Sequence, residues 1–372
     1  MVAPALRRAL AALLPGEDEG LLLQSCLADR DRCRYAWQAF TADGRDLAEL
    51  FRTDRGEQKR LGPLLAWNLR RNGVEAEPSL LTVLRTGMLR EELRSELYRG
   101  ILMDVLCALD EAQVTFLALG GADLGVSVYP EPMLRHAHDI DLLVTERDVE
   151  RSARALERAG FHRVPSEDGV VELRHGRELP VRLNTSLFHL SCHPGSLDAL
   201  LASSRIQDLG GRSARVLARE DALALVLGRA CYSAKRATLQ WACDAWMLSK
   251  QAPLHPERLI GTLQHARLLL PASVLLRYLS SLGAPFEQGL VDQVEEAARG
   301  SNALDRDLAL HGLRHGLPAG WRSALGRMPD RATRLWALGR MTLPSPAYVR
   351  WAHGVQRRVL MPWYYVKRAL GA

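Results

Sequence analysis

The sequence predicts an α+β protein in which a central mixed β-sheet with flanking helices lies between an N-terminal and a C-terminal helical region. Helical spacing of apolar residues runs from Val2 to about Tyr98 and returns from Leu217 onward. Between these regions, short apolar runs alternate with glycine-bounded turns, which is typical of strands. The 372 residues exceed the usual size of one domain, so we expect several packed units. The expected boundaries are residues 1–100, 101–205 and 206–372.

The N-terminal region consists of apolar segments with helical periodicity, separated by stop signals. Apolar residues recur at three- and four-residue spacing in LLLQSCLADRDRCRYAWQAF and in LGPLLAWNLRRNGV. Gly73 is expected to end one helix, and Pro78 to start the next. From Ser79 to Glu111 we expect either one helix or a pair of helices that a break near Arg99 and Gly100 would separate.

The middle third of the chain changes in character at Gln113. VTFLALGG has the features of a buried strand that enters a tight turn, and HDIDLLV those of a second buried strand. The segment after HDIDLLV has helical periodicity and ends at Gly160. VVELR and PVRLN flank a turn-prone HGR, so they are expected to form a hairpin.

Helical spacing continues from Leu217 to about Gly300, and the remaining tail is irregular, basic and rich in proline. After Gly320 the tail carries ten arginine and lysine residues against one acid, Asp330. Its tryptophans and tyrosines among arginines suit nucleic-acid binding through phosphate contacts and stacking. They also suit docking on an acidic helical surface of the same protein, which we favour.

The composition excludes several classes of protein. Hydrophobic residues at 47% and charged residues at 25% argue against a disordered or fibrous chain. The six cysteines form no close pair of the kind that zinc or redox motifs require, so we expect reduced thiols in a cytoplasmic protein. No stretch reaches the roughly 18 to 20 uninterrupted apolar residues of a membrane span.

The chemistry is expected at two acids of the strand HDIDLLV. Side chains alternate along a strand, so Asp139 and Asp141 share one face while Ile140 and Leu142 point to the other. Carboxylates so placed suit a divalent cation, which prefers oxygen ligands. An isolated D-x-D pattern more often marks a solvated strand edge, so the surrounding sequence decides between the two interpretations.

The surrounding sequence resembles a known family. A strand ending in Gly120 and Gly121, then YPEPMLRHAHDIDLLV, then a helix ending in Gly160 closely resemble the core of a family of uncharacterised nucleotidyltransferases of the polymerase-β-like superfamily. Its members typically read LKGAALA, then YPDPGLRPMSDIDLLV, then a helix ending in GF or GY. LGPLLAWNLRRNG is similar to the family's PLLYRNL helix and LQWACDAWMLSK to its W-x-x-D helix, so the likeness covers residues 20–290.

The resemblance implies a nucleotidyltransferase-like fold with a two-metal site for nucleotidyl transfer. Asp139 and Asp141 would hold Mg²⁺ or Mn²⁺. Gly120 and Gly121 would let a phosphate approach the backbone N–H groups, and Arg135 would help to neutralise it. The implied donor is an NTP, and the acceptor is an unidentified small molecule, peptide or protein.

The chain departs from the family pattern at three positions. Gly120 stands where the family has the lysine of LKG. PVRLNTSLF aligns with a family strand of the type VELHW, so that Arg182 replaces an acid and Asn184 a histidine. A guanidinium at this position would disfavour a second cation and could occupy its place. Glu172, on the paired strand, is either a substitute carboxylate or a surface residue of the hairpin.

Other residues near the motif have two interpretations each. Asp244 corresponds to the family's helical aspartate, although capping or pairing with Lys235 or Arg236 would also explain it. His136 and His138 could ligate a metal or carry a proton, but loop histidines are more often solvated. Two functions therefore stay open: a metal-dependent nucleotidyltransferase, and a degenerate member that keeps the fold as a binding or scaffolding module.

Overall fold

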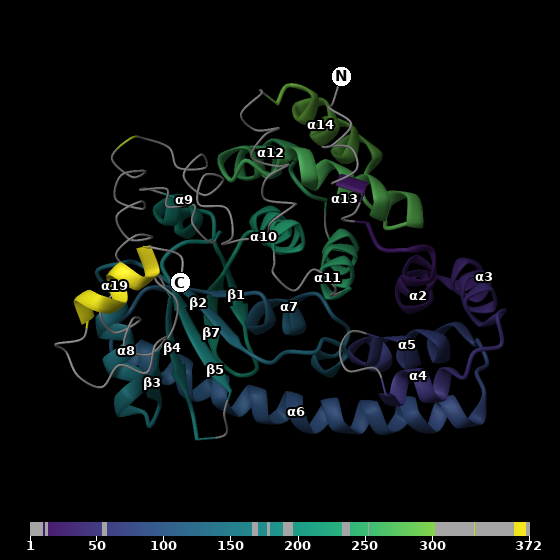
Figure 1. Cartoon of the computed structure of the whole chain (residues 1–372), viewed down its shortest axis with the longest axis horizontal. Coiled ribbons are helices and arrows are strands. Elements are labelled where there is room, and N and C mark those ends of the chain that lie inside the picture. Colours follow the sequence, from purple (N-terminus) through teal and green to yellow (C-terminus); the bar gives the residue numbers. More distant parts are fainter. Residues whose placement is uncertain are drawn as a thin grey trace.

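The computed structural model describes residues 10–11, 14–53, 58–165, 170–176, 179–188, 196–232, 239–251, 253–301, 331 and 361–369. Figure 1 shows a mixed sheet with N-terminal helices to its right and below it, and with later helices above it. The N-terminal helices are α2 (Glu17–Leu27), α3 (Arg30–Thr41), α4 (Leu47–Thr53), α5 (Gln58–Asn72) and α6 (Pro78–Glu111). The helical N-terminal region expected from the sequence is confirmed.

Helix α6 runs without interruption for 34 residues, so of the two alternatives the single helix is confirmed and the break near Arg99 and Gly100 does not occur. One glycine inside a helix costs only about 1 kcal/mol relative to alanine. Packing outweighs that cost, because Ile101, Val105 and Leu109 of the same helix are buried in a hydrophobic core under the sheet. Figure 1 shows α6 running along the lower side of the protein, beneath α4 and α5.

Seven strands form the sheet in the order β3-β4-β5-β2-β1-β7-β6. β1 pairs antiparallel with β2, while β2 and β5, and β1 and β7, are parallel pairs. The β4–β5 hairpin and the buried strands β1 and β2 confirm the expected middle region. The strands are β1 (Phe116–Leu119), β2 (Ile140–Val144), β3 (His162–Val164), β4 (Val170–Arg174), β5 (Pro180–Asn184), β6 (Arg205–Asp208) and β7 (Ser213–Val216).

Three strands were not expected from the sequence, namely β3, β6 and β7. Each has only three or four residues, and β3 and β6 have no fully buried position. Such short strands carry little periodic signal. The boundary expected between residues 205 and 206 falls inside β6.

The remaining helices follow β1 in the sequence, and several of them pack against the sheet. α8 ends shortly before Gly160, whose φ of 91° is the left-handed conformation expected of a glycine stop. Apart from residue 331 and α19, the basic aromatic tail lies outside the described residues. These helices are α7 (Gly121–Ser127), η1 (Pro132–Leu134, a 3₁₀ turn), α8 (Val149–Arg158), α9 (Ser196–Ala202), α10 (Arg219–Tyr232), α11 (Gln240–Ser249), α12 (Pro256–His265), α13 (Leu269–Leu282), α14 (Gln288–Arg299) and α19 (Met361–Ala369).

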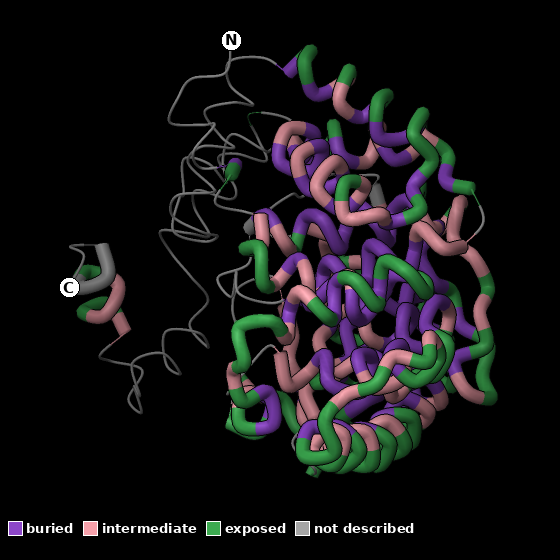
Figure 2. The backbone as a smooth tube through the Cα atoms, turned by 90° about the vertical axis from the view of Figure 1, so that its right-hand side faces the viewer, coloured by how far each residue is buried: buried purple, intermediate pink, exposed green. Residues whose placement is uncertain are grey.

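The two faces of the sheet belong to different hydrophobic cores. Ile140, Leu142 and Val144 of β2 pack with residues of α6 and α8, whereas Leu143 belongs to the core formed with α10 and α11. Alternation along β2 therefore assigns its even- and odd-numbered positions to opposite sides. Figure 2 shows the buried interior and the exposed outer side of α6.

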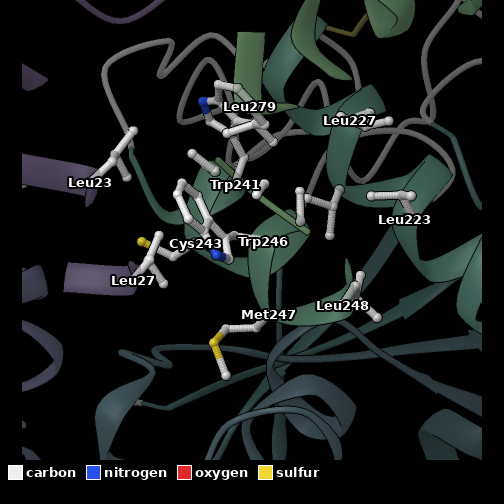
Figure 3. Packing of buried hydrophobic residues seen from close by; sticks show 14 of the residues in the cluster. Leu23, Leu27, Leu223, Leu227, Trp241, Cys243, Trp246, Met247, Leu248 and Leu279 are labelled. Atoms are coloured by element: carbon white, nitrogen blue, oxygen red, sulfur yellow. The ribbon is translucent and has the colours of Figure 1, made fainter. Parts of the chain in front are cut away.

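The N-terminal helices and the later helices share one core. Leu23 and Leu27 of α2 lie close to Cys243 and Trp246 of α11 in Figure 3. The Trp246 side chain is almost completely buried. Because this packing joins segments about 220 residues apart, the helical regions at the two ends of the sequence are not independent units. Among the helices that the structure describes, none is long and apolar enough to cross a bilayer.

Candidate functional site

Strand β2 places Asp139 and Asp141 on the face of the sheet that α10 covers. Asp141 pairs in register with Leu119 at the end of β1 and with Arg182 of β5. Asp139 precedes the first residue of β2, so alternation gives it the same face. The side chain of Asp141 is 7% exposed and that of Asp139 18% exposed. Both carboxylates are thus partly buried beside the turn that follows β1.

Arg182 forms an ion pair with the first of these acids. Its Nη1 lies 2.5 Å from Oδ2 of Asp139, and its Nε lies 3.2 Å from Oε2 of Glu172. Glu172 is only 14% exposed and also binds Arg174. A row of alternating charges therefore runs from β4 across β5 to the start of β2.

The turn after β1 explains why a glycine is needed at position 120. Gly120 has a φ of 53°, a conformation that side chains other than glycine rarely adopt. A Cβ atom there would lie 2.9 Å from Nη1 of Arg229. The same guanidinium donates from Nη2 to Oδ2 of Asp141 at 2.5 Å. The diglycine turn and the acids therefore lie side by side, as the sequence predicts.

Arg135 and Asp244 form a second, buried arrangement behind the turn. Arg135 donates through Nε and Nη2 to the two carboxylate oxygens of Asp244, at 2.9 and 2.8 Å. The two side chains are 8% and 5% exposed. The Tyr129 hydroxyl donates to the same carboxylate at 2.8 Å. This network joins the YPEPMLR segment to helix α11.

The network bears on two residues of the expected site. Burial lowers the pKa of Arg135, but Asp244 opposes this and leaves the pKa above its usual value, so the guanidinium stays charged. A Cβ on Gly121 would lie 3.1 Å from Nη1 of Arg135. Two of the three guanidinium nitrogens of Arg135 bind Asp244, which leaves Nη1 for any other partner. A role of Arg135 in phosphate binding stays a prediction. Lys235 and Arg236, the other suggested partners of Asp244, lie outside the described residues.

The two histidines before β2 have different surroundings. Nδ1 of His136 lies 2.9 Å from Oε2 of the buried Glu91 on α6. His138 is half exposed, and its Nε2 lies 3.6 Å from Oδ2 of Asp139. Loss of hydration lowers the pKa of His138 more than Asp139 raises it, so this pKa lies below its usual value. Neither side chain joins a cluster of metal ligands within the described residues.

Asp139 is ionised at neutral pH. Burial raises its pKa, but the positive charges of His138, Arg182 and Arg229 lower it further, and the net pKa lies below the usual value. Its backbone carbonyl accepts a hydrogen bond from the Tyr98 hydroxyl of α6 at 3.0 Å. Tyr98 was not expected from the sequence. It fixes the start of β2 and hence the position of the first acid.

The donor set of this site suits one divalent cation rather than two. Asp139 and Asp141 supply carboxylate oxygens from one face, and Mg²⁺ is commonly held by one or two carboxylates together with substrate phosphates. No cluster of three His, Cys, Asp or Glu side chains in the described parts of the chain is placed to hold a metal by itself. The positive charge of Arg182 beside Asp139 would disfavour a second cation. The residues present therefore fit a single ion that a nucleotide helps to bind.

Comparison of the sequence with protein-family models covers the segments that form this site. A family model described as "Uncharacterised nucleotidyltransferase" matches residues 52–283, which is more than half of the chain. The chain belongs to this family of nucleotidyltransferases. The matched range extends from the N-terminal helices through the sheet to the end of α13. The resemblance to this family that the sequence suggested is confirmed.

Two solved structures are similar to about half of the chain. The antibiotic-resistance factor ANT(2'')-Ia is 15% identical, with a TM-score of 0.36, over 50% of this chain and 96% of its own. An antigenic nucleotidyltransferase-like protein from Paracoccidioides brasiliensis is 17% identical, with a TM-score of 0.33, over 51% of this chain and 94% of its own. No curated protein matches the chain.

Proposed function

We propose that this protein transfers a nucleoside monophosphate from an NTP to a hydroxyl or phosphate oxygen of a small molecule, peptide or protein. The observation that carries the proposal is the placement of Asp139 and Asp141 on one face beside the Gly120 turn. Two carboxylates next to a backbone turn without side chains suit a metal-bound triphosphate. Asp139 and Asp141 would hold one Mg²⁺ or Mn²⁺ ion.

The proposed reaction requires no covalent intermediate with the protein. The acceptor oxygen forms a bond to the α-phosphorus, and the bond from that phosphorus to the oxygen leading to the β-phosphate breaks. Pyrophosphate leaves with the bonding electron pair, and the proton of a hydroxyl acceptor passes to solvent. The cation, when bound, would neutralise phosphate charge. The chain itself positions the reactants and stabilises charge, which are the main contributions in phosphoryl chemistry.

Arg182 supports a second candidate, a degenerate member that binds ligands without catalysis. Both acids are bound to guanidinium groups, and by the resemblance to the family Arg182 would replace the third acid. If the ion pairs were permanent, neither carboxylate would be free to hold a cation. The exposure of Arg182 and Arg229, 36% and 45%, favours exchange of their contacts with a ligand. The enzyme is therefore our first candidate.

Metal-dependent nucleotide binding separates the two candidates. We would measure the thermal stability of the full chain with ATP, GTP, CTP or UTP, each with and without Mg²⁺ or Mn²⁺. A ligand at 100 times its Kd stabilises a protein by about 2.7 kcal/mol. Stabilisation that needs both metal and nucleotide, and that disappears in Asp139→Ala and Asp141→Ala, supports the enzyme. Metal-independent binding, or none, supports the degenerate member.

A matched control removes another carboxylate that binds an arginine. Asp110 of α6 forms an ion pair with Arg212, and both side chains are more than 40% exposed. Asp110→Ala should retain the full metal-dependent stabilisation. Transfer itself is then tested by incubating the protein with α-labelled NTP and a cell lysate and searching for a labelled product. Absence of label with every NTP, despite metal-dependent binding, would contradict transfer.

A further inference from the structure

The sequence leaves the phosphate turn without the lysine of the family pattern, yet the structure brings a cation to the same place. Arg229 of α10 lies over Gly120 and contacts Asp141. We infer that Gly120 and Arg229 together form the phosphate-binding subsite of the proposed nucleotide site, with the guanidinium taking the role of the missing lysine. This inference rests on the proposed function and deepens it.

The position of Arg229 follows from close packing of α10. A Cβ on the preceding Gly228 would lie 2.9 Å from Cε1 of Phe188 and 3.0 Å from Cδ1 of Leu268. Such a contact is closer than side chains tolerate, so Gly228 allows the helix to lie against both residues. The tight packing fixes the point from which the Arg229 side chain extends toward the β1 turn.

In the ion pair between Arg229 and Asp141, the arginine is the partner that faces solvent. The side chain of Arg229 is 45% exposed, whereas its partner Asp141 is 7% exposed. A ligand that enters from solvent therefore meets the guanidinium before the carboxylate. Asp141 is the hydrogen-bond partner of Arg229 within the described part of the chain, and that bond uses only Nη2. The Nη1 group, directed at Gly120, remains available to a phosphate oxygen.

A lysine at position 120 and the Arg229 guanidinium in its present place exclude each other. Any side chain at position 120 would begin 2.9 Å from Nη1 of Arg229, and its backbone would be strained at a φ of 53°. A lysine would also set a second positive charge beside the guanidinium. Gly120 therefore leaves room for Arg229, and the phosphate-binding cation comes from α10 instead of from the turn. Arginine can grip phosphate with two parallel hydrogen bonds, which a lysine cannot do.

Calorimetric titration with inorganic tripolyphosphate, and with the NTP that gives the largest thermal shift, tests this subsite. Both are titrated with and without Mg²⁺ into the wild type, Arg229→Gln and Arg229→Lys. Loss of a charge-assisted hydrogen bond should weaken binding by about 10-fold or more in Arg229→Gln, and by less in Arg229→Lys. The control is Arg219→Gln, in the first turn of the same helix, which should bind within about 2-fold of the wild type.

Two further variants test the role of the glycine. Gly120→Ala keeps Arg229 but puts a Cβ against its guanidinium, so binding should weaken although no charge is lost. Gly120→Lys combined with Arg229→Ser restores one cation at the turn, and it should bind tripolyphosphate more tightly than Arg229→Ser alone. Melting temperatures without ligand establish which variants are folded. If Arg229→Gln does not fold, Arg229→Lys and Gly120→Ala decide the outcome.

The results distinguish this inference from the function on which it rests. If the wild type binds neither nucleotide nor tripolyphosphate, the proposed function fails and the subsite fails with it. If the wild type binds and Arg229→Gln binds equally well, only the subsite is overturned. A weakening in Arg229→Gln that Arg219→Gln reproduces also overturns it, because the effect would then reflect the net charge of the helix.

Discussion

The short segment from Arg135 to Asp141 takes part in two arrangements of arginine and aspartate, which differ in burial and geometry. Arg135 and Asp244 are almost fully buried and share two hydrogen bonds, with Tyr129 as a further donor. Arg182 and Arg229 are partly exposed, and each gives its aspartate one close contact of 2.5 Å. The first arrangement joins two elements of the fold, whereas the second borders solvent.

The difference indicates which charges the fold needs and which a ligand can take over. A buried, fully bonded pair is costly to break because its partner is left as an uncompensated charge. A partly exposed pair contributes about 0 to 1 kcal/mol, so its groups can exchange partners at little cost. On this basis we expect Asp244 to support stability, and Asp139 and Asp141 to bind the ligand of the proposed function.

The largest expected effect is on stability. Asp244→Ala should lower the free energy of unfolding by about 3 to 5 kcal/mol, because it leaves the buried guanidinium of Arg135 without its counter-charge. Urea denaturation measures this loss, and Asp110→Ala serves as the exposed control with an expected change below about 1 kcal/mol. A loss below about 1 kcal/mol for Asp244→Ala would remove the contrast between the two arrangements.

Asp141→Asn should show the opposite profile. Its effect on the free energy of unfolding without ligand should stay within about 1 kcal/mol, since its partner is partly exposed. The stabilisation by metal and nucleotide should vanish, because an amide is a poor ligand for Mg²⁺. Thermal shift and urea denaturation on the same preparation give both quantities. A variant that binds nucleotide with metal as well as the wild type does would show that Asp141 is not a ligand.

A smaller effect is expected from pH at Asp139. Its pKa in the folded state lies below the usual value, so its contribution to stability is present above the unfolded pKa of about 3.9 and is lost as the pH falls through the folded pKa. The difference in unfolding free energy between the wild type and Asp139→Asn should therefore be present at pH 5, where the carboxylate is ionised, and should shrink below about pH 4. Urea titrations at pH 5 and at lower pH measure it, and a difference that does not shrink on acidification below pH 4 would mean that the carboxylate is not stabilised in its charged form.

The smallest effect is expected at Glu172. Glu172→Gln removes one charge from the row that includes Arg174 and Arg182, but Arg182 keeps its contact with Asp139. The free energy of unfolding should change by about 0.5 kcal/mol or less, and nucleotide affinity by less than about 3-fold. Denaturation and calorimetry check both values. A loss of metal-dependent binding as large as that of Asp141→Asn would identify Glu172 as the substitute carboxylate.

The parts of the site that lie close together in sequence could be predicted. The alternation of a strand places Asp139 and Asp141 on one face, and consecutive glycines after a buried strand indicate a tight turn. The β4–β5 hairpin follows from two strand-like runs around a turn. Each of these inferences uses a local period or a local backbone preference.

The contacts that span long stretches of sequence could not be predicted in this way. Arg229 is 88 residues from Asp141, and Asp244 is 109 residues from Arg135. Helical periodicity shows which side of α10 is apolar, but not which strand its arginine reaches. The two edge strands of the sheet, β3 and β6, were missed for a related reason. Neither has a fully buried position, and each is held in place by pairing with its neighbouring strand.

The most direct test of the account is a crystal structure with Mn²⁺ and a non-hydrolysable NTP, in which anomalous scattering locates the metal. We expect one Mn²⁺ between the carboxylates of Asp139 and Asp141, with the triphosphate against the Gly120 turn. Two ions, a metal bound elsewhere, or carboxylates that still hold both guanidinium groups while the nucleotide is bound would contradict the single-ion site.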